Sequence, residues 1–225
     1  MFFECIFLIF LFILYFFIYV DMKINKHNEL YLFDSEFTKT NLNKEICLKL
    51  PFYFDGQHIQ DIYDKSSLTK VKKVKHHYEL YTKPYDSIPL LEPHLRFKCW
   101  QDIYYISKRK TLPLLMDTCS INYYRIQKGS CKVVLIHPKF KEHFICEDGT
   151  LCSNLTKLDF IRNNPHMKCM VCHENTILYV PNHWIMYVEN MENKTSILDI
   201  IHYSTLCNQL IRWIKKDLIT NQIES

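Results

Sequence analysis

The feature that most constrains this chain is a long apolar run at its N-terminus. Residues 2–20 are apolar except for Glu4, and no charged residue lies between Cys5 and Val20. Because an α-helix rises about 1.5 Å per residue, a helix over this run reaches about 28 Å, close to the thickness of a bilayer's hydrocarbon core. The run therefore predicts a transmembrane anchor over residues 1–21, with the membrane contact made through residues 2–20.

A cleaved signal peptide and a buried core helix are the competing interpretations of this run. A signal peptide has a basic start, a shorter apolar stretch and small residues at its cleavage site. Here no Lys or Arg precedes the run, and residues 16–19 include no small residue. Lys23 and Lys26 follow the run. By the positive-inside rule we expect a single-pass membrane protein whose C-terminal domain lies in the cytosol.

The rest of the chain is interpreted as a linker and one domain. Residues 22–45 are polar and lack a clear period, which is typical of a juxtamembrane linker, and the domain is expected over residues 46–225. A chain that is 48% hydrophobic and 23% charged is not intrinsically disordered. Only 3 glycines occur, which excludes Gly-rich phosphate-binding loops. A net charge of +4 is too small to predict a nucleic-acid partner.

Short apolar runs separated by turn residues predict β-strands within the domain. The runs are residues 121–126, 131–136, 176–180, 184–188 and 195–201. A turn signal at residues 127–130 predicts that the first two runs form a hairpin. Pro181 lies between the third and fourth runs, which we interpret as a second strand pair.

An amphipathic helix is expected at the end of the chain. Its apolar residues recur at spacings of three and four, and they are Leu206, Leu210, Trp213, Ile214 and Leu218. Ser204 or Thr205 is a suitable N-cap. We expect the apolar face of this helix, which runs from Thr205 to about Leu218, to pack on the β domain.

Two segments resemble a known family. The first is Pro113–Thr118, followed by Asn122, Gly129 and the run from Lys132 to Pro138; the second is Ile177–Asn190, which contains Trp184. Together they resemble the cupin-like, JmjC-type proteins, the group that includes asparaginyl and lysyl hydroxylases. The resemblance covers about residues 50–201. It implies a mainly β fold, the double-stranded β-helix or jelly-roll barrel.

The resemblance also implies an iron site. In the family two histidines and one carboxylate hold Fe(II) and leave open positions for 2-oxoglutarate and oxygen. Here the carboxylate position is Asp117, but the two histidine positions are Leu115 and Met186. Leucine has no lone pair, and a methionine thioether suits Cu(I) better than Fe(II). We therefore expect a degenerate metal site, no cofactor, and a binding or scaffolding protein rather than an enzyme.

The position of the first histidine depends on how the segment is aligned. If the alignment is anchored on Asn122, the first two ligand positions move to Met116 and Thr118, and the histidine is again absent. Asn122, Lys132 and Asn190 are candidate remnants of the cosubstrate site. Lys132 is also a candidate partner for the carboxylate of Asp117, provided that it faces the barrel interior.

The sequence leaves two alternative functions open. One is an active dioxygenase that uses Fe(II) and 2-oxoglutarate, with displaced ligands such as Asp117 together with His137 or His183. On a strand His183 would face away from Met186, because the two are an odd number of residues apart. The other is a zinc-stabilised interaction protein, whose four candidate ligands are Cys146, Cys152, Cys169 and Cys172.

Overall fold

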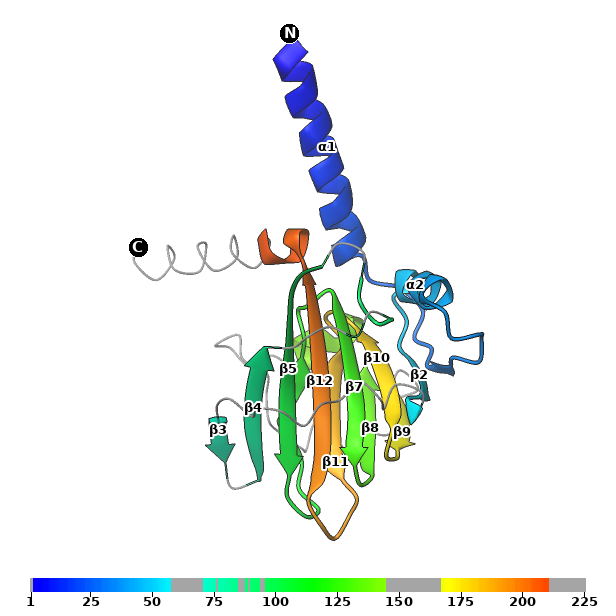
Figure 1. Cartoon of the computed structure of the whole chain (residues 1–225), viewed down its shortest axis with the longest axis vertical. Coiled ribbons are helices and arrows are strands. Elements are labelled where there is room, and N and C mark those ends of the chain that lie inside the picture. The colour runs from blue at the N-terminus through cyan, green and yellow to red at the C-terminus, as the bar shows by residue number, and fades with distance from the viewer. Residues whose placement is uncertain are drawn as a thin grey trace.

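The N-terminal run forms a single helix that projects from a β-rich body (Figure 1). A computed structural model describes residues 2–57, 71–75, 77–84, 88, 90–93, 96–144 and 167–210. α1 spans Phe2–Met22. Its segment Phe3–Val20 has a mean hydropathy of 2.6, and no part of this segment is buried against the body. The predicted helix is confirmed and is long and apolar enough to cross a membrane. Its insertion in a membrane stays a prediction.

The body consists of two β-sheets. The larger sheet has the order β1 (Tyr31–Leu32), β2 (Phe52–Asp55), β10 (Thr176–Pro181), β7 (Ile121–Lys128), β12 (Ser196–Thr205), β5 (Arg96–Ile106), β4 (Tyr78–Pro84) and β3 (Val71–Lys75). The smaller sheet has the order β6 (Leu115–Met116), β11 (Ile185–Asn190), β8 (Cys131–Ile136) and β9 (Met167–Cys172). Neighbouring strands are antiparallel except for the parallel pair β1 and β2.

From β5 onward the chain passes repeatedly between the two sheets. β5, β7, β10 and β12 belong to the larger sheet, whereas β6, β8, β9 and β11 belong to the smaller one. Eight antiparallel strands distributed in this way form a jelly roll, in which the two sheets enclose a common core. The expectation of a mainly β jelly-roll domain is confirmed by this strand order.

The predicted strands are present, but both predicted pairings are wrong. β7 pairs with β10 and β12, whereas β8 pairs with β11 and β9. The chain changes sheet at Gly129, which has φ 84°, and a Cβ there would lie 2.5 Å from the hydroxyl oxygen of Ser196. β10 and β11 likewise lie in different sheets. A turn signal marks a reversal of the chain and does not tell whether the reversal stays within one sheet.

Part of the segment interpreted as a linker folds onto the larger sheet. α2 (Lys39–Leu48) begins after Thr38, whose hydroxyl accepts a hydrogen bond from the backbone N–H of Asn41 at 3.3 Å. Leu42 is 1% exposed, and it shares an apolar cluster with Phe33 and Phe52. Only Leu42 and Ile46 of α2 are buried, and two residues are too few to give a visible period in the sequence.

The C-terminal helix begins as expected, but its first apolar side chain does not pack. Residues 206–210 are helical, and the hydroxyl of Thr205 accepts a hydrogen bond from the backbone N–H of Asn208 at 3.2 Å, so Thr205 is the N-cap. Leu206 is 53% exposed, which contradicts the expected packing of this residue. Leu210 is half-buried, and the other predicted positions, from Trp213 to Leu218, lie outside the described residues.

Strand alternation separates the inner and outer faces of the larger sheet. On β12, Leu198 and Ile200 belong to the apolar cluster between the sheets, whereas Ile201 and Tyr203 belong to the cluster on the outer face with α2. Because side chains alternate along a strand, His202 is the next residue that points inward. A polar residue thus enters the barrel interior three residues before the C-terminal end of β12. That end of β12 lies on the side from which α1 projects (Figure 1).

Candidate functional site

The two positions where the resemblance implies histidine ligands are direct neighbours. Met186 of β11 is the antiparallel partner of Leu115 of β6. Met186 is 1% exposed in the cluster between the sheets, and the partly buried Leu115 packs against the same cluster. Neither side chain offers a nitrogen lone pair for iron. The two residues therefore form an apolar contact beside Asp117.

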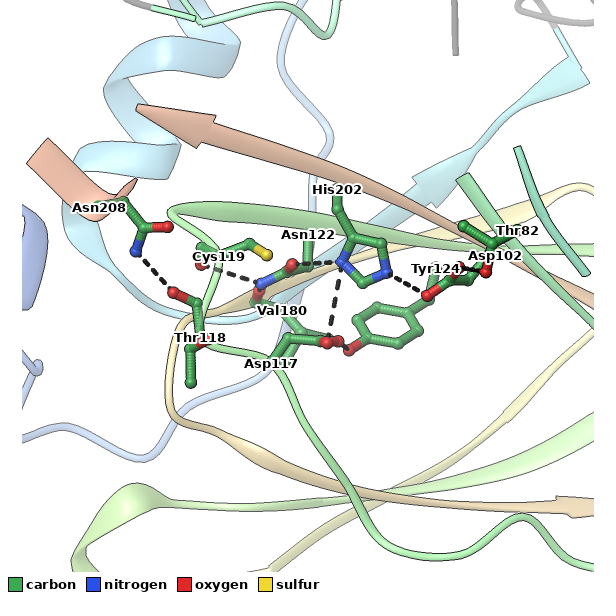
Figure 2. A network of polar contacts seen from close by, with 10 residues as sticks. All are labelled: Thr82, Asp102, Asp117, Thr118, Cys119, Asn122, Tyr124, Val180, His202 and Asn208. Atoms are coloured by element: carbon green, nitrogen blue, oxygen red, sulfur yellow. Dashed lines mark hydrogen bonds and ion pairs between the residues drawn. The ribbon is translucent and has the colours of Figure 1, made fainter. Parts of the chain in front are cut away.

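The carboxylate of Asp117 lies in a polar network at this end of the barrel (Figure 2). One of its oxygens accepts a hydrogen bond from the hydroxyl of Tyr124, and the other lies 3.8 Å from Nδ1 of His202. The side chain of Asp117 is 24% exposed, whereas that of His202 is 4% exposed. Asp117 is thus the part of this pair that solvent reaches.

His202 lies between two carboxylates. Its Nδ1 is 2.9 Å from Oδ1 of Asn122, and its Nε2 is 3.4 Å from Oδ2 of Asp102. The imidazole stacks on Trp100, with ring centroids 5.1 Å apart and an interplanar angle of 25°. Asp102 in turn accepts a hydrogen bond from the hydroxyl of Thr82. The network therefore joins strands β4, β5, β7 and β12 through their inward-facing side chains (Figure 2).

The two carboxylates decide the charge of His202. Burial by itself lowers the pKa of this imidazole, but Asp117 and Asp102 outweigh burial and raise the pKa to about 10. At neutral pH both ring nitrogens therefore carry a proton, and Nδ1–H donates to Asn122. Burial, reinforced by Asp117, raises the pKa of the Tyr124 hydroxyl, so this group stays protonated and donates to the carboxylate.

The arrangement suits charge pairing. A doubly protonated imidazole has no lone pair for a metal, and Asp102 and Asp117 approach opposite nitrogens of the ring. Across the described parts of the chain, no three His, Cys, Asp or Glu side chains are grouped so that they could hold a metal ion. One imidazolium between two carboxylates leaves one net negative charge, and Asp117 is the more exposed of the two carboxylates.

Only one of the three candidate cosubstrate residues lies in this network. The amide nitrogen of Asn122 donates to the carbonyls of Cys119 at 3.2 Å and Val180 at 3.5 Å, while its oxygen accepts from His202. Lys132 of β8 shares a strand face with Val134 and Ile136, which pack in a cluster outside the barrel interior. The condition for pairing Lys132 with Asp117, a side chain that faces the barrel interior, is therefore not met.

Asn190 lies at the opposite end of the barrel. Its amide nitrogen donates to the carbonyls of Ile106 at 2.9 Å and Lys194 at 2.8 Å, and its oxygen accepts from the hydroxyl of Ser196 at 2.6 Å. Ser196 is six residues before His202 on β12, which corresponds to about 20 Å along the strand. Asn190 thus holds the loop between β11 and β12 and does not approach Asp117.

The two alternative histidine ligands have other partners. Nε2–H of His137 donates to the carbonyl of Asn25 at 2.8 Å, and Nδ1 of His137 accepts from the backbone N–H of Lys139 at 3.1 Å. His183 has φ 68° in the turn between β10 and β11, and its backbone N–H donates to the carbonyl of Asp117 at 2.9 Å. The strand argument for His183 is wrong, because the residue precedes the start of β11.

The candidate zinc ligands are only partly described. Cys146 and Cys152 lie outside the described residues. On β9 Cys169 is exposed and Cys172 is buried, and positions three apart on a strand point to opposite faces. Burial raises the pKa of Cys172 to about 12 and that of its cross-strand partner Cys131 to about 11, so both are thiols at neutral pH. Cys169 and Cys172 do not converge on a common point.

Sequence reasoning missed the residues that surround Asp117. The expected strand over residues 195–201 stops one residue before His202, and no strand was expected at β5, which supplies Trp100 and Asp102. The available signal was the alternation of Leu198, Ile200 and His202, which places a histidine at an inward position.

Comparisons with known proteins concern the fold. No protein-family model matches the sequence, and no curated protein does. Similar solved structures include the oxalate decarboxylase of Lactobacillus farciminis in its formate complex, with 10% identity over 60% of this chain and 32% of that chain and a TM-score of 0.40. Bacillus subtilis oxalate decarboxylase at pH 4.6 has 10% identity over 61% of this chain and 28% of that chain, with a TM-score of 0.39.

A single domain of another protein is similar to this chain at a comparable level. The cupin domain of Schizosaccharomyces pombe Cnp3 has 10% identity over 59% of this chain and 70% of that chain, with a TM-score of 0.35. The chain spans only about a third of the length of the two oxalate decarboxylases that it resembles.

Proposed function

We propose that this chain is a membrane-anchored, cupin-like protein with a degenerate JmjC-type metal site, and that it acts by binding or scaffolding and not by iron-dependent catalysis. The observation that carries the proposal is the cross-strand contact between Leu115 and Met186. These are the positions where the resemblance implies histidines, and Met186 is 1% exposed among apolar side chains. The residues present do not fit an Fe(II) ion.

The remaining carboxylate supports the same proposal. Asp117 accepts a hydrogen bond from Tyr124 and pairs with the imidazolium of His202. A metal ion bound by Asp117 would displace these partners and would place a second cation beside a positively charged imidazole. Repulsion between like charges at this separation disfavours that arrangement.

Anchoring by α1 is supported by the surface of the helix. No part of its segment Phe3–Val20 is buried, so the described body does not cover the apolar side chains. Lys23 and Lys26 at the end of α1 favour a cytosolic location for the body. An apolar helix that no part of its own protein covers is stable in a bilayer, where its side chains meet lipid tails.

The experiment is a metal analysis of the full-length protein purified in detergent. The parent protein is expected to contain no stoichiometric iron and to leave 2-oxoglutarate unconsumed. The Leu115→His and Met186→His double variant is expected to bind iron, because it supplies two imidazoles beside Asp117. The matched control is the Leu115→Gln and Met186→Gln double variant, which adds polarity without imidazole and should stay iron-free.

Two results would refute the proposal. Iron at one equivalent in the parent protein, or turnover of 2-oxoglutarate by it, would overturn the loss of the metal site. Release of the parent protein from membranes by alkaline carbonate would overturn the anchor. Circular dichroism of both double variants shows whether they keep the β-rich fold, so that a failure to bind iron is not mistaken for unfolding.

A further inference from the structure

Exposed apolar side chains gather at the end of the barrel from which α1 projects. Beyond α1, the large apolar side chains that are exposed in the described part of the chain are Ile24, Leu32, Leu48, Phe97, Val171, Met191 and Leu206. Ile24 follows α1, Leu48 ends α2, Phe97 begins β5 and Leu206 follows β12. Figure 1 shows these ends of α2, β5 and β12 at the same end of the long axis as the base of α1.

These four side chains are well exposed. Phe97 is 61% exposed, Leu206 53%, Leu48 48% and Ile24 44%. Phe97 lies on β5 between Arg96 and Lys98, whose cross-strand partners on β12 are Thr205 and Ser204. The backbone of Phe97 is therefore next to the end of β12, which Leu206 follows. A cluster of exposed apolar side chains on a folded body usually marks a contact with another molecule or a membrane.

The base of α1 is fixed to this end of the body. The side-chain amide of Asn25 donates to the carbonyl of Leu48 at 2.7 Å, and the carbonyl of Asn25 accepts from His137 at 2.8 Å. Only two residues separate Met22, the last residue of α1, from Asn25. Even fully extended, this connection spans about 10 Å. An inserted α1 therefore keeps this end of the body next to the bilayer surface.

We propose that the α1 end of the barrel lies against the bilayer, with Ile24, Leu48, Phe97 and Leu206 in contact with lipid. The inference rests on the proposed anchoring by α1. Lipid is the occupant because α1 and the tethered Asn25 bring the cluster to the membrane surface. The exposed Lys23, Lys26 and Lys98 around it suit the negatively charged headgroups of a cytosolic leaflet.

The orientation has a consequence for the polar network. His202 lies three residues before Thr205, the last residue of β12, and its cross-strand partner Trp100 lies three residues after Phe97. The Asp117 carboxylate, which contacts His202, is therefore near the same end of the barrel. A ligand of Asp117 would therefore bind at the membrane interface and not in bulk water.

The test places a photo-cross-linking residue in the full-length protein. Benzoylphenylalanine replaces Phe97 in one variant and Met191 in the control, and both proteins are reconstituted in vesicles of phosphatidylcholine and phosphatidylserine. Met191 is 49% exposed and follows β11 in the loop to β12, at the opposite end of the barrel. Illumination should yield lipid adducts, detected by mass spectrometry, at position 97 and at least tenfold fewer at position 191.

Each outcome decides between lipid and another occupant. If the protein resists carbonate extraction but position 97 gives no lipid adduct, or no more than position 191, the proposed orientation is wrong while the anchor stands. Cross-links from position 97 to a second copy of the chain would replace lipid by self-association. Extraction of the protein by carbonate would overturn the anchor and the orientation together.

Discussion

Each end of the barrel holds a buried asparagine, and the two amides differ in what surrounds them. Asn190 is bonded to uncharged groups only, namely backbone carbonyls, a backbone N–H and the hydroxyl of Ser196. Asn122 contacts an imidazolium that two carboxylates flank. The end with Asn190 is therefore held by neutral hydrogen bonds. The end with Asn122 is held by charges, whose strength depends on pH and on every partner being present.

The largest expected effect is the removal of the imidazolium at the charged end. His202→Phe fills a similar volume but leaves Asp102 and Asp117 without the cation between them. Breaking a buried ion pair costs about 3–5 kcal/mol, so we expect a loss of that order in the free energy of unfolding. Urea unfolding of the full-length protein in detergent measures it. The control is His173→Phe at an exposed turn, which should change stability by less than about 0.5 kcal/mol.

The pH dependence of stability separates the two ends more sharply. The folded pKa of His202 is about 10, above the ordinary value of 6.5, so its contribution is fully present below pH 6.5 and is lost as pH rises through 10. Burial raises the pKa of Asp199 to about 6, and Cys131 has an ordinary value of 9.0. Among the described residues, His202 is therefore the main buried group whose protonation differs between the folded and unfolded states from pH 6.5 to 9.

In that window the parent protein should lose stability as pH rises, by at most about 1.4 kcal/mol per pH unit. His202→Phe should remove most of this slope, whereas Asn190→Ala should keep it. Urea midpoints at several pH values measure the slope for the three proteins. A parent protein whose stability is flat from pH 6.5 to 9 would mean that His202 is neutral in the folded state.

The smallest expected effects come from the two amides themselves. Asn190→Ala leaves several buried polar groups without their partner and should cost about 2–3 kcal/mol at any pH. Asn122→Ala removes fewer hydrogen bonds and should cost about 1–2 kcal/mol. Unfolding midpoints at pH 7 give the ranking. A larger loss for Asn122→Ala would show that the network around His202 is more strongly coupled than its separate contacts suggest.

Several elements could be predicted from local signals in the sequence. The charge-free run predicted α1, and alternation with turn residues placed β7, β8, β10, β11 and most of β12. The assignment of Leu115 and Met186 to the histidine positions of the family stays a prediction of the resemblance. Each of these signals depends on residues that are close in the sequence, where helix and strand periodicity act directly.

The pairing of the strands and the side chains that contact Asp117 could not be predicted, because they depend on contacts between distant segments. Gly129 and the turn at Asn182 and His183 carry the chain from one sheet to the other, so strands that follow each other do not pair. Asn122 and His202 are 80 residues apart, and Lys132 is excluded from Asp117 because its strand position faces outward. Contacts of this kind depend on strand register and sheet order, and the pairing of distant strands leaves no periodic trace in either segment.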